Sequence, residues 1–301
     1  MAPSTRRTYQ TAFKKFTSFV ANTLQQNNSL PYTQQQIHLY VAHLHSANYK
    51  HSTIVSNLSA ISHYHKINLM PDPVSSYPTV KLLSGVRNSQ VVKPDQRLPI
   101  TRTLLLGLVT ALTACAPTQY DAVLYHSMYT VMYYACLRAS EVLQTDTPQH
   151  IITIENFTIT TNSLNATIHL NSYKHAAHQS ADILLTATSA IDCPIQATQK
   201  YLQLRPPTAG PLFISQHKQP VLRPAFLHTL TACLRYLNIA PDSYNIHSFT
   251  FGFRIGRTTD MAQQNVPHDA IQRIGRWKSN AYLKYIRPPP VAAQPLSTSC
   301  N

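Results

Sequence analysis

A set of basic and aromatic residues near the carboxy-terminal end of the chain has the chemistry to act on a phosphodiester. Arg254 lies in the run Phe-Arg-Ile-Gly-Arg, Trp277 in Gly-Arg-Trp and Tyr285 in Tyr-Ile-Arg, while Arg138 lies far upstream in Leu-Arg-Ala-Ser-Glu. A guanidinium group binds phosphate oxygens in two places and stays charged at any working pH, and a tyrosine hydroxyl can act as a nucleophile. These residue types can break a phosphodiester without a metal ion.

The charge of the chain indicates a polyanionic partner. Its 301 residues include 25 lysines and arginines against 11 aspartates and glutamates, a formal net charge of +14, although only 12% of residues are charged. Such a bias is typical of proteins that bind nucleic acid, but ribosomal-type and membrane-surface proteins share it. Composition alone does not separate these classes.

Cysteine, histidine and hydropathy patterns argue against several other classes. The five cysteines are scattered without a Cys-x-x-Cys pair, and histidine pairs such as His43 and His45 do not share a helix face. We therefore expect free thiols, no metal site and no cofactor. No apolar stretch approaches the roughly 18 residues that cross a membrane, and the first residues lack an apolar signal core. A soluble intracellular protein without a membrane partner is expected, nuclear in a eukaryote and otherwise cytoplasmic.

The amino-terminal part of the chain is predicted to be helical. Tyr9, Phe13, Phe16 and Val20 recur at helical spacing, and further helices are expected from Thr33, from Ser52 and over Val80–Val86. Residues 1–92 are interpreted as a helical domain, and 93–99 as an extended linker because prolines break it.

Residues 100–290 are predicted to form a second domain, followed by a tail over 291–301. Apolar helices are expected around Leu104–Leu112 and Tyr125–Ala135, the second of which leads into Arg138. A small antiparallel sheet of about three strands is expected within 151–185, from short alternating runs at Ile151–Ile154, Phe157–Thr160 and Thr167–Leu170. Helical periodicity returns from Pro194 to Tyr285. The fold class is therefore mainly α with a small antiparallel β-sheet.

Residues 253–287 resemble the carboxy-terminal block of the recombinases of DIRS-like retrotransposons, which are tyrosine recombinases of the phage-integrase-like family. The ordered match spans about 35 residues, and the segment around Arg138 is similar to the family's first arginine segment. The resemblance implies a helical SAM-like core-binding domain, a catalytic domain, and site-specific cutting and rejoining of DNA through a 3′-phosphotyrosyl intermediate. It also implies a mobile-element origin and four protomers on two double-stranded DNA sites, without ATP, metal or cofactor.

The resemblance assigns roles to individual residues. Arg138 and Arg254 would clamp the phosphate, Trp277 would occupy the family's His/Trp position, and Tyr285 would be the nucleophile. Lys174 falls where the family places the lysine that protonates the leaving oxygen, in the turn between the second and third strands. DNA contacts are expected from basic residues on the first helix, in the linker and in the carboxy-terminal motifs, namely Arg6, Arg7, Lys14, Lys15, Lys93, Arg97, Arg257 and Arg276.

One element departs from the family pattern. The family places a histidine three residues before its second arginine, whereas His247 precedes Arg254 by seven residues. On a regular helix these intervals correspond to about 4.5 Å and about 10 Å along the axis. Either a bend at Gly252 brings His247 to the phosphate, or Phe251 occupies the catalytic position and proton transfer is impaired.

Several alternatives follow from the same residues. Tyr282 is a competing nucleophile, Trp277 could be a core anchor, and Arg138 could pair with Glu141 at i, i+3. The chain could be a catalytically impaired or domesticated DNA-binding protein, which the displaced His247 favours. A type IB topoisomerase-like enzyme would use the same chemistry, although the helical amino-terminal domain favours a recombinase. The DNA sequence recognised does not follow from these residues.

Overall fold

The structure is a computed structural model that describes the chain outside residues 2, 92–97, 146–149, 174–178, 242–251 and 288–301. The chain divides into two compact units, Met1–Pro94 and Asp95–Asn301, each with its own hydrophobic core. Mainly helical units with one small antiparallel sheet agree with the predicted fold class. In the described part of the chain, no helix combines the length and apolar character needed to span a bilayer.

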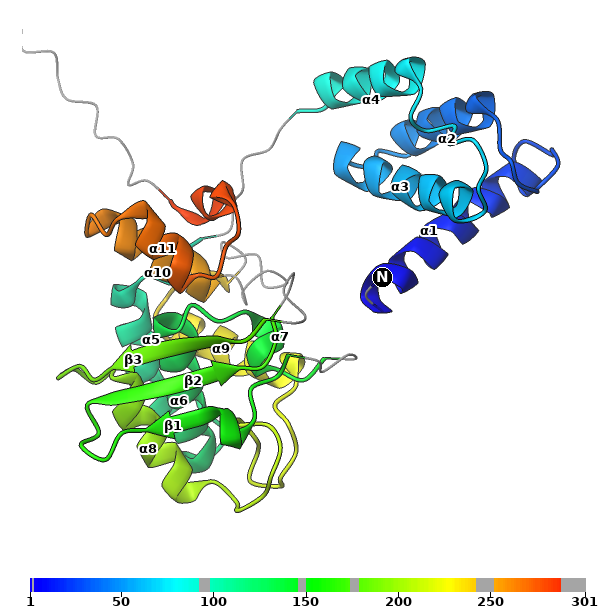
Figure 1. Cartoon of the computed structure of the whole chain (residues 1–301). Coiled ribbons are helices and arrows are strands. Elements are labelled where there is room, and N and C mark those ends of the chain that lie inside the picture. Colours follow the sequence, from blue (N-terminus) through cyan, green and yellow to red (C-terminus); the bar gives the residue numbers. More distant parts are fainter. Residues whose placement is uncertain (2, 92–97, 146–149, 174–178, 242–251, 288–301) are drawn as a thin grey trace, which may run out of the picture. The chain divides into compact units, whose positions relative to one another are not determined.

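The first unit contains helices α1 to α4 (Figure 1), which are Pro3–Asn22, Gln34–Ser46, His51–Ile67 and Tyr77–Ser89. Thr33 begins α2 with a capping box, since its side chain accepts from the backbone N–H of Gln36 and the Gln36 side chain accepts from that of Thr33. The apolar stripe of α1, including Phe16, packs into a core with α2 and α3. Two predicted boundaries were wrong: α3 begins before Ser52, and α4 extends beyond Val80–Val86 at both ends.

Helix α6 (Gln119–Tyr134) contributes many of the buried side chains in the core of the second unit. Met128, Tyr129 and Met132 of α6 are fully buried in the core because apolar residues occupy nearly every face of the helix. The helices of this unit are α5 (Arg102–Cys115), α6 (Gln119–Tyr134), α7 (Ala139–Val142), α8 (Pro194–Leu204), α9 (Arg223–Tyr236), α10 (Gly252–Gln263) and α11 (His268–Ile274), with 3-10 helices at Ile154–Asn156 and Asn280–Tyr285.

The sheet of the second unit has the antiparallel order β1-β2-β3. Its strands are β1 (Phe157–Ile159), β2 (Asn165–Leu170) and β3 (Ala181–Thr186). Ile168 of β2 lies opposite Phe157 and Ile183, and these side chains join the core. The predicted strand at Ile151–Ile154 was wrong. Thr153 donates its backbone N–H and hydroxyl to the Asn156 side chain, and this local pair begins a 3-10 turn instead.

Helix α10 packs directly on the backbone that leads into α5. The N–H of Ile100 donates to the carbonyl of Gly252 at 2.9 Å. A Cβ at Gly256 would lie 1.7 Å from the carbonyl oxygen of Ile100, so this close approach requires glycine. Glycine in Phe-Arg-Ile-Gly-Arg therefore sets how deeply α10 and its Arg254 sit in the unit.

Candidate functional site

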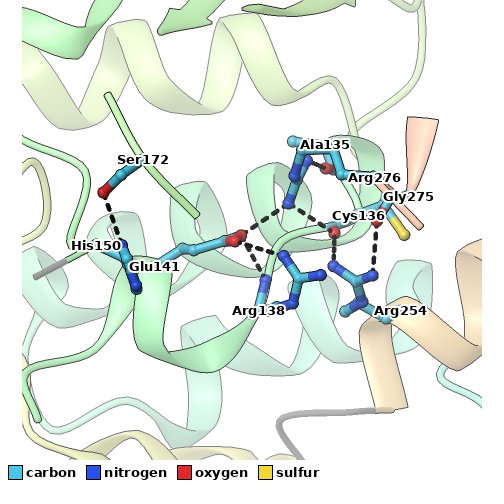
Figure 2. A network of polar contacts seen from close by, with 9 residues as sticks. All are labelled: Ala135, Cys136, Arg138, Glu141, His150, Ser172, Arg254, Gly275 and Arg276. Atoms are coloured by element: carbon cyan, nitrogen blue, oxygen red, sulfur yellow. Dashed lines mark hydrogen bonds and ion pairs between the residues drawn. The ribbon is translucent and has the colours of Figure 1, made fainter. Parts of the chain in front are cut away.

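The turn that follows α6 presents backbone carbonyls to arginines from distant parts of the chain (Figure 2). Cys136 adopts a left-handed conformation, with φ of 49°, and its N–H donates to the carbonyl of Tyr133 at 3.1 Å. The chain then reaches Arg138, which immediately precedes α7. The carbonyls of Ala135 and Cys136 are thereby directed at the carboxy-terminal motifs.

Arg254 lies in the first turn of α10 and is 1% exposed. Its Nη1 donates to the carbonyl of Cys136 at 2.8 Å and its Nη2 to that of Gly275 at 2.8 Å. Among the described residues its Nε finds no hydrogen-bond acceptor. Burial lowers the pKa of Arg254, and the like charges of Arg138 and Arg276 lower it further, while Cys136 and Glu141 oppose this. An arginine nevertheless stays protonated in a protein, so Arg254 remains a cation.

Two aromatic rings lie against this guanidinium group. The Cζ atom of Arg254 is 4.4 Å from the ring centroid of Trp277 and 5.8 Å from that of Tyr285. The two ring centroids are 5.1 Å apart with an interplanar angle of 56°. The ring of Trp277 crosses the α-carbon of Gly275, where an added Cβ would lie 1.4 Å from Cζ3 of Trp277. Glycine therefore allows Trp277 to reach Arg254.

Tyr282 and Tyr285 occupy different environments. Tyr282 is 5% exposed, and its hydroxyl hydrogen-bonds with Nδ1 of His268 at 2.8 Å. Tyr285 is half-buried beside Arg254, and its carbonyl accepts from the hydroxyl of Thr259 in α10 at 3.3 Å. Tyr285 is thus the tyrosine whose ring lies beside Arg254, while the hydroxyl of Tyr282 is held by His268.

Glu141 lies at the centre of the polar network. This carboxylate is 1% exposed and contacts Arg138 Nη1 at 3.0 Å and Arg276 Nη2 at 2.8 Å. The i, i+3 pair of Arg138 and Glu141, which was the alternative role for Arg138, is therefore present, and Arg276 binds the same carboxylate. Three guanidinium groups, counting Arg254, converge where one carboxylate is present, so the cluster carries excess positive charge. An anion such as a phosphate would compensate that charge.

A second polar network, which residue patterns did not predict, connects α10 to the start of α5 and the end of α6. Asp260 of α10 accepts from the hydroxyl of Tyr133 and from the backbone N–H of Arg102, the latter at 2.7 Å. The guanidinium group of Arg102 donates to Asp192 at 2.7 Å, and Tyr134 donates to the same carboxylate at 2.7 Å. In the sequence, the only indication of this role for Asp260 was an isolated acidic residue within a segment expected to be helical. These contacts join α10 to the end of α6, the two elements that carry Arg254 and the turn before Arg138.

The remaining predicted residues fall into three groups. Arg6, Arg7, Lys14 and Lys15 are exposed on α1. Arg257 is half-buried over the rings of Tyr133 and Tyr134, and Arg276 is buried, so neither has the open position expected of a DNA contact. Outside the described residues lie Lys93, Arg97, Lys174 and His247.

The roles of Lys174 and His247 and the question of a metal site remain to be considered. In the sequence, Lys174 lies between β2 and β3, and its catalytic role stays a prediction. The reach of His247 to the phosphate stays a prediction. In the described part of the chain, no three His, Cys, Asp or Glu side chains are grouped to hold a metal ion.

Comparisons with known proteins agree with this architecture. Residues 1–69 match the family model described as the phage integrase, N-terminal SAM-like domain. A search of curated proteins found no match. Among solved structures, the XerH site-specific recombinase bound to difH substrate, in a pre-cleavage complex, is 14% identical, with a TM-score of 0.59 over 91% of this chain and 73% of that chain.

Two other solved structures cover nearly the whole chain. The Tn1549 transposon integrase in complex with transposon right end DNA is 13% identical, with a TM-score of 0.61 over 96% of this chain and 90% of that chain. A lambda integrase dimer bound to a COC′ core site is 11% identical, with a TM-score of 0.60 over 99% of this chain and 93% of that chain. The fold is therefore that of the solved tyrosine recombinases and integrases.

Proposed function

We propose that this protein is a site-specific DNA recombinase or integrase that cuts and rejoins DNA through a 3′-phosphotyrosyl intermediate. The observation that carries the proposal is the convergence of Arg254, Trp277 and Tyr285 with the turn that leads into Arg138. These residues come from separate segments of the chain, yet Arg254 contacts the carbonyl of Cys136 at 2.8 Å and lies 4.4 Å and 5.8 Å from the two rings. The family match of residues 1–69 and the recombinase-like fold support it.

In this proposal the hydroxyl oxygen of Tyr285 attacks the scissile phosphorus. The bond between tyrosine oxygen and phosphorus forms as the bond to the 5′ oxygen breaks, and Lys174 protonates that oxygen, which leaves as a 5′-hydroxyl. The tyrosine proton passes to a base, for which His247 is the candidate. Arg138 and Arg254 stabilise the charge on the non-bridging oxygens, and the indole N–H of Trp277 can donate to one of them. Attack by a second strand's 5′-hydroxyl reverses these steps and rejoins DNA.

The proposed partner is double-stranded DNA, held in part by the exposed cations of α1, Arg6, Arg7, Lys14 and Lys15. Four protomers on two DNA sites would allow the exchange of strands, as the family resemblance implies. That resemblance also supports an origin in a DIRS-like mobile element and, in a eukaryotic host, a nuclear location. A transposon integrase among the structural matches is consistent with a mobile-element origin.

A DNA-binding protein with impaired catalysis is the second candidate function. The interval of seven residues between His247 and Arg254 favours it. The two Nη atoms of Arg254 also already bind backbone carbonyls, which leaves this guanidinium less able to turn toward a phosphate. Such a protein would keep salt-dependent DNA affinity but form no covalent bond to DNA.

A covalent-trapping experiment separates the two functions. The full chain is incubated with a pool of duplexes whose sequence is randomised around a central nick, so that the short cleaved strand diffuses away and the protein stays attached. Denaturing electrophoresis then detects the labelled adduct. Tyr285→Phe should abolish the adduct because it removes the nucleophilic oxygen. Tyr282→Phe, the matched control, should retain it.

The outcomes assign the function directly. An adduct with the wild-type chain that is lost in Tyr285→Phe supports the recombinase. An adduct that persists in Tyr285→Phe and disappears in Tyr282→Phe would reverse the assignment of the nucleophile. Binding of the pool without any covalent adduct would support the second candidate function, a DNA-binding protein with impaired catalysis.

A further inference from the structure

Arg276 is turned into the protein, although a DNA-facing position was expected for it. Its side chain is 4% exposed, and its backbone adopts a left-handed conformation with φ of 55°. For a residue with a Cβ, that backbone conformation costs roughly 1–2 kcal/mol, and the contacts of the Arg276 side chain must offset this cost. Arg276 donates from Nη1 to the carbonyl of Ala135 at 3.2 Å and from Nη2 to the carboxylate of Glu141 at 2.8 Å.

Glu141 connects Arg276 to Arg138. One oxygen, Oε1, accepts from Nη1 of Arg138 at 3.0 Å, and the other, Oε2, accepts from Nη2 of Arg276 and from the backbone N–H of Arg138, both at 2.8 Å. The carboxylate is 1% exposed, so these donors must offset the cost of burying its charge. Each oxygen therefore faces a different guanidinium group (Figure 2).

We propose that Arg276 is a positioning residue for the DNA cleavage proposed above, acting through Glu141 to hold Arg138 in place and available to a phosphate. Two guanidinium groups share one negative charge, so Arg138 keeps attraction for a second anion. Without Arg276, the carboxylate of Glu141 would pair with Arg138 alone. It would then neutralise the charge of Arg138, and the Glu141 side chain could rotate toward that guanidinium. This inference rests on the proposed function.

Arg276 is also joined to the second clamp arginine. The carbonyl of Cys136 accepts from Nη2 of Arg276 at 3.4 Å and from Nη1 of Arg254 at 2.8 Å. The next residue in the chain, Trp277, stacks on Arg254. Loss of Arg276 would therefore disturb the carbonyl that orients Arg254 as well as the carboxylate that orients Arg138.

The test is single-turnover cleavage of the nicked duplex pool, at saturating DNA, by the full chain carrying Arg276→Met. We expect the rate to fall about 100-fold, because a misplacement of about 1 Å can cost that factor. The slope of log affinity against log salt should not change, since a buried arginine neutralises no phosphate. Arg273→Met is the matched control. Arg273 lies three residues earlier, is 77% exposed and pairs with Asp269, so its loss should leave the cleavage rate unchanged.

A double-mutant cycle tests the route through Glu141. If Arg276 acts through this carboxylate, Glu141→Gln combined with Arg276→Met should cleave no more slowly than the slower of the two single variants. Rate losses that multiply would instead show that the two residues act independently. That result would overturn the proposed route.

Other outcomes would also contradict the inference. A wild-type rate in Arg276→Met excludes a positioning role, and a salt slope reduced by about one together with weaker binding identifies a phosphate contact. If Arg276→Met does not fold, Arg276→Gln replaces it, since glutamine removes the positive charge beside Glu141 but keeps a polar N–H donor. Its rate should fall at an unchanged salt slope, and a wild-type rate would overturn the inference. Absence of an adduct with the wild-type chain contradicts the proposed function itself.

Discussion

At the scale of single residues, the Gly-Arg-Trp triplet sends adjacent side chains to different partners. Gly275 leaves room for the ring of Trp277, which lies over Arg254, while Arg276 turns to Glu141. The carbonyl of Gly275 binds Nη2 of Arg254. A cation over an indole ring contributes roughly 0.5–2 kcal/mol, more where water is excluded. The triplet thus holds Arg254 from two sides.

Gly275→Ala should displace Trp277 from Arg254, because the added Cβ would lie 1.4 Å from a ring atom. Trp277 is the only tryptophan, so its fluorescence reports this site alone. We expect emission shifted to longer wavelength, stronger quenching by acrylamide and a lower yield of covalent adduct. Gly85→Ala, where no atom lies within 4 Å of the new Cβ, should leave all three unchanged. Unaltered emission in Gly275→Ala would contradict the stacking.

The family resemblance proposed members for this candidate site but not the direction of each side chain. The roles of Arg138, Arg254, Trp277 and Tyr285 were predicted from that resemblance and stay predictions. The burial of Arg276 was not, because it depends on a left-handed backbone at 276 and on Glu141, which lies 135 residues away in the sequence. No local pattern encodes a partner at that separation.

At the scale of elements, the position of α10 decides whether the arginines meet. Gly256 lies against the backbone of Ile100, and Asp260 binds Tyr133 of α6. Helical periodicity predicted these helices, although boundaries moved, as in α6, which begins at Gln119 rather than Tyr125. Periodicity could not predict the 3-10 form of Asn280–Tyr285, because such turns are short and lack a distinct apolar spacing. It also could not predict the docking of α10, because one missing methyl group controls it.

Gly256→Ala should destabilise the second unit strongly. The new Cβ would lie 1.7 Å from the backbone oxygen of Ile100, which cannot move without displacing the start of α5. We expect a loss of roughly 3 kcal/mol, the upper part of the usual range for overpacking, measured by urea unfolding through Trp277 emission. Gly107→Ala in α5 is the control. Its Cβ would meet the flexible side chain of Leu237 at 3.2 Å, so a small effect is expected, and equal losses in the two variants would contradict the explanation.

At the scale of the whole molecule, the net charge of +14 is expected to dominate DNA affinity. Replacing the four exposed cations of α1 with glutamine, at Arg6, Arg7, Lys14 and Lys15, should weaken binding similarly for all DNA sequences. It should also lower the magnitude of the slope of log affinity against log salt by about one for each lost phosphate contact. Arg235→Gln, an exposed position on α9, serves as the control. An unchanged slope in the α1 variant would exclude that helix from the DNA interface.

The stability of each unit should depend on pH separately, because each contains an aspartate whose pKa is lowered in the folded state. Burial alone would raise the pKa of Asp192, but hydrogen bonds from Arg102 and Tyr134 outweigh it and lower this pKa. The carboxylate therefore stabilises the second unit above the ordinary aspartate pKa of about 3.9, and this contribution is lost as the pH falls through the lower folded value. In the first unit, burial alone would raise the pKa of Asp72, but hydrogen bonds from Ser62 and the backbone N–H of Val74 and the charge of Lys66 lower it.

Asp192→Asn should flatten the acid limb of the second unit's stability curve. Trp277 emission monitors that unit alone, so urea unfolding followed from about pH 6 to about pH 2 isolates it from the first. At pH 7 the variant should lose roughly 1.5–3 kcal/mol, the usual contribution of hydrogen bonds to a charged group. Asp72→Asn should leave the Trp277 transition unchanged at every pH. If Asp192→Asn kept the full acid dependence, carboxylates other than Asp192 would hold the second unit together, and the link between Arg102 and Tyr134 would not support α10 as described.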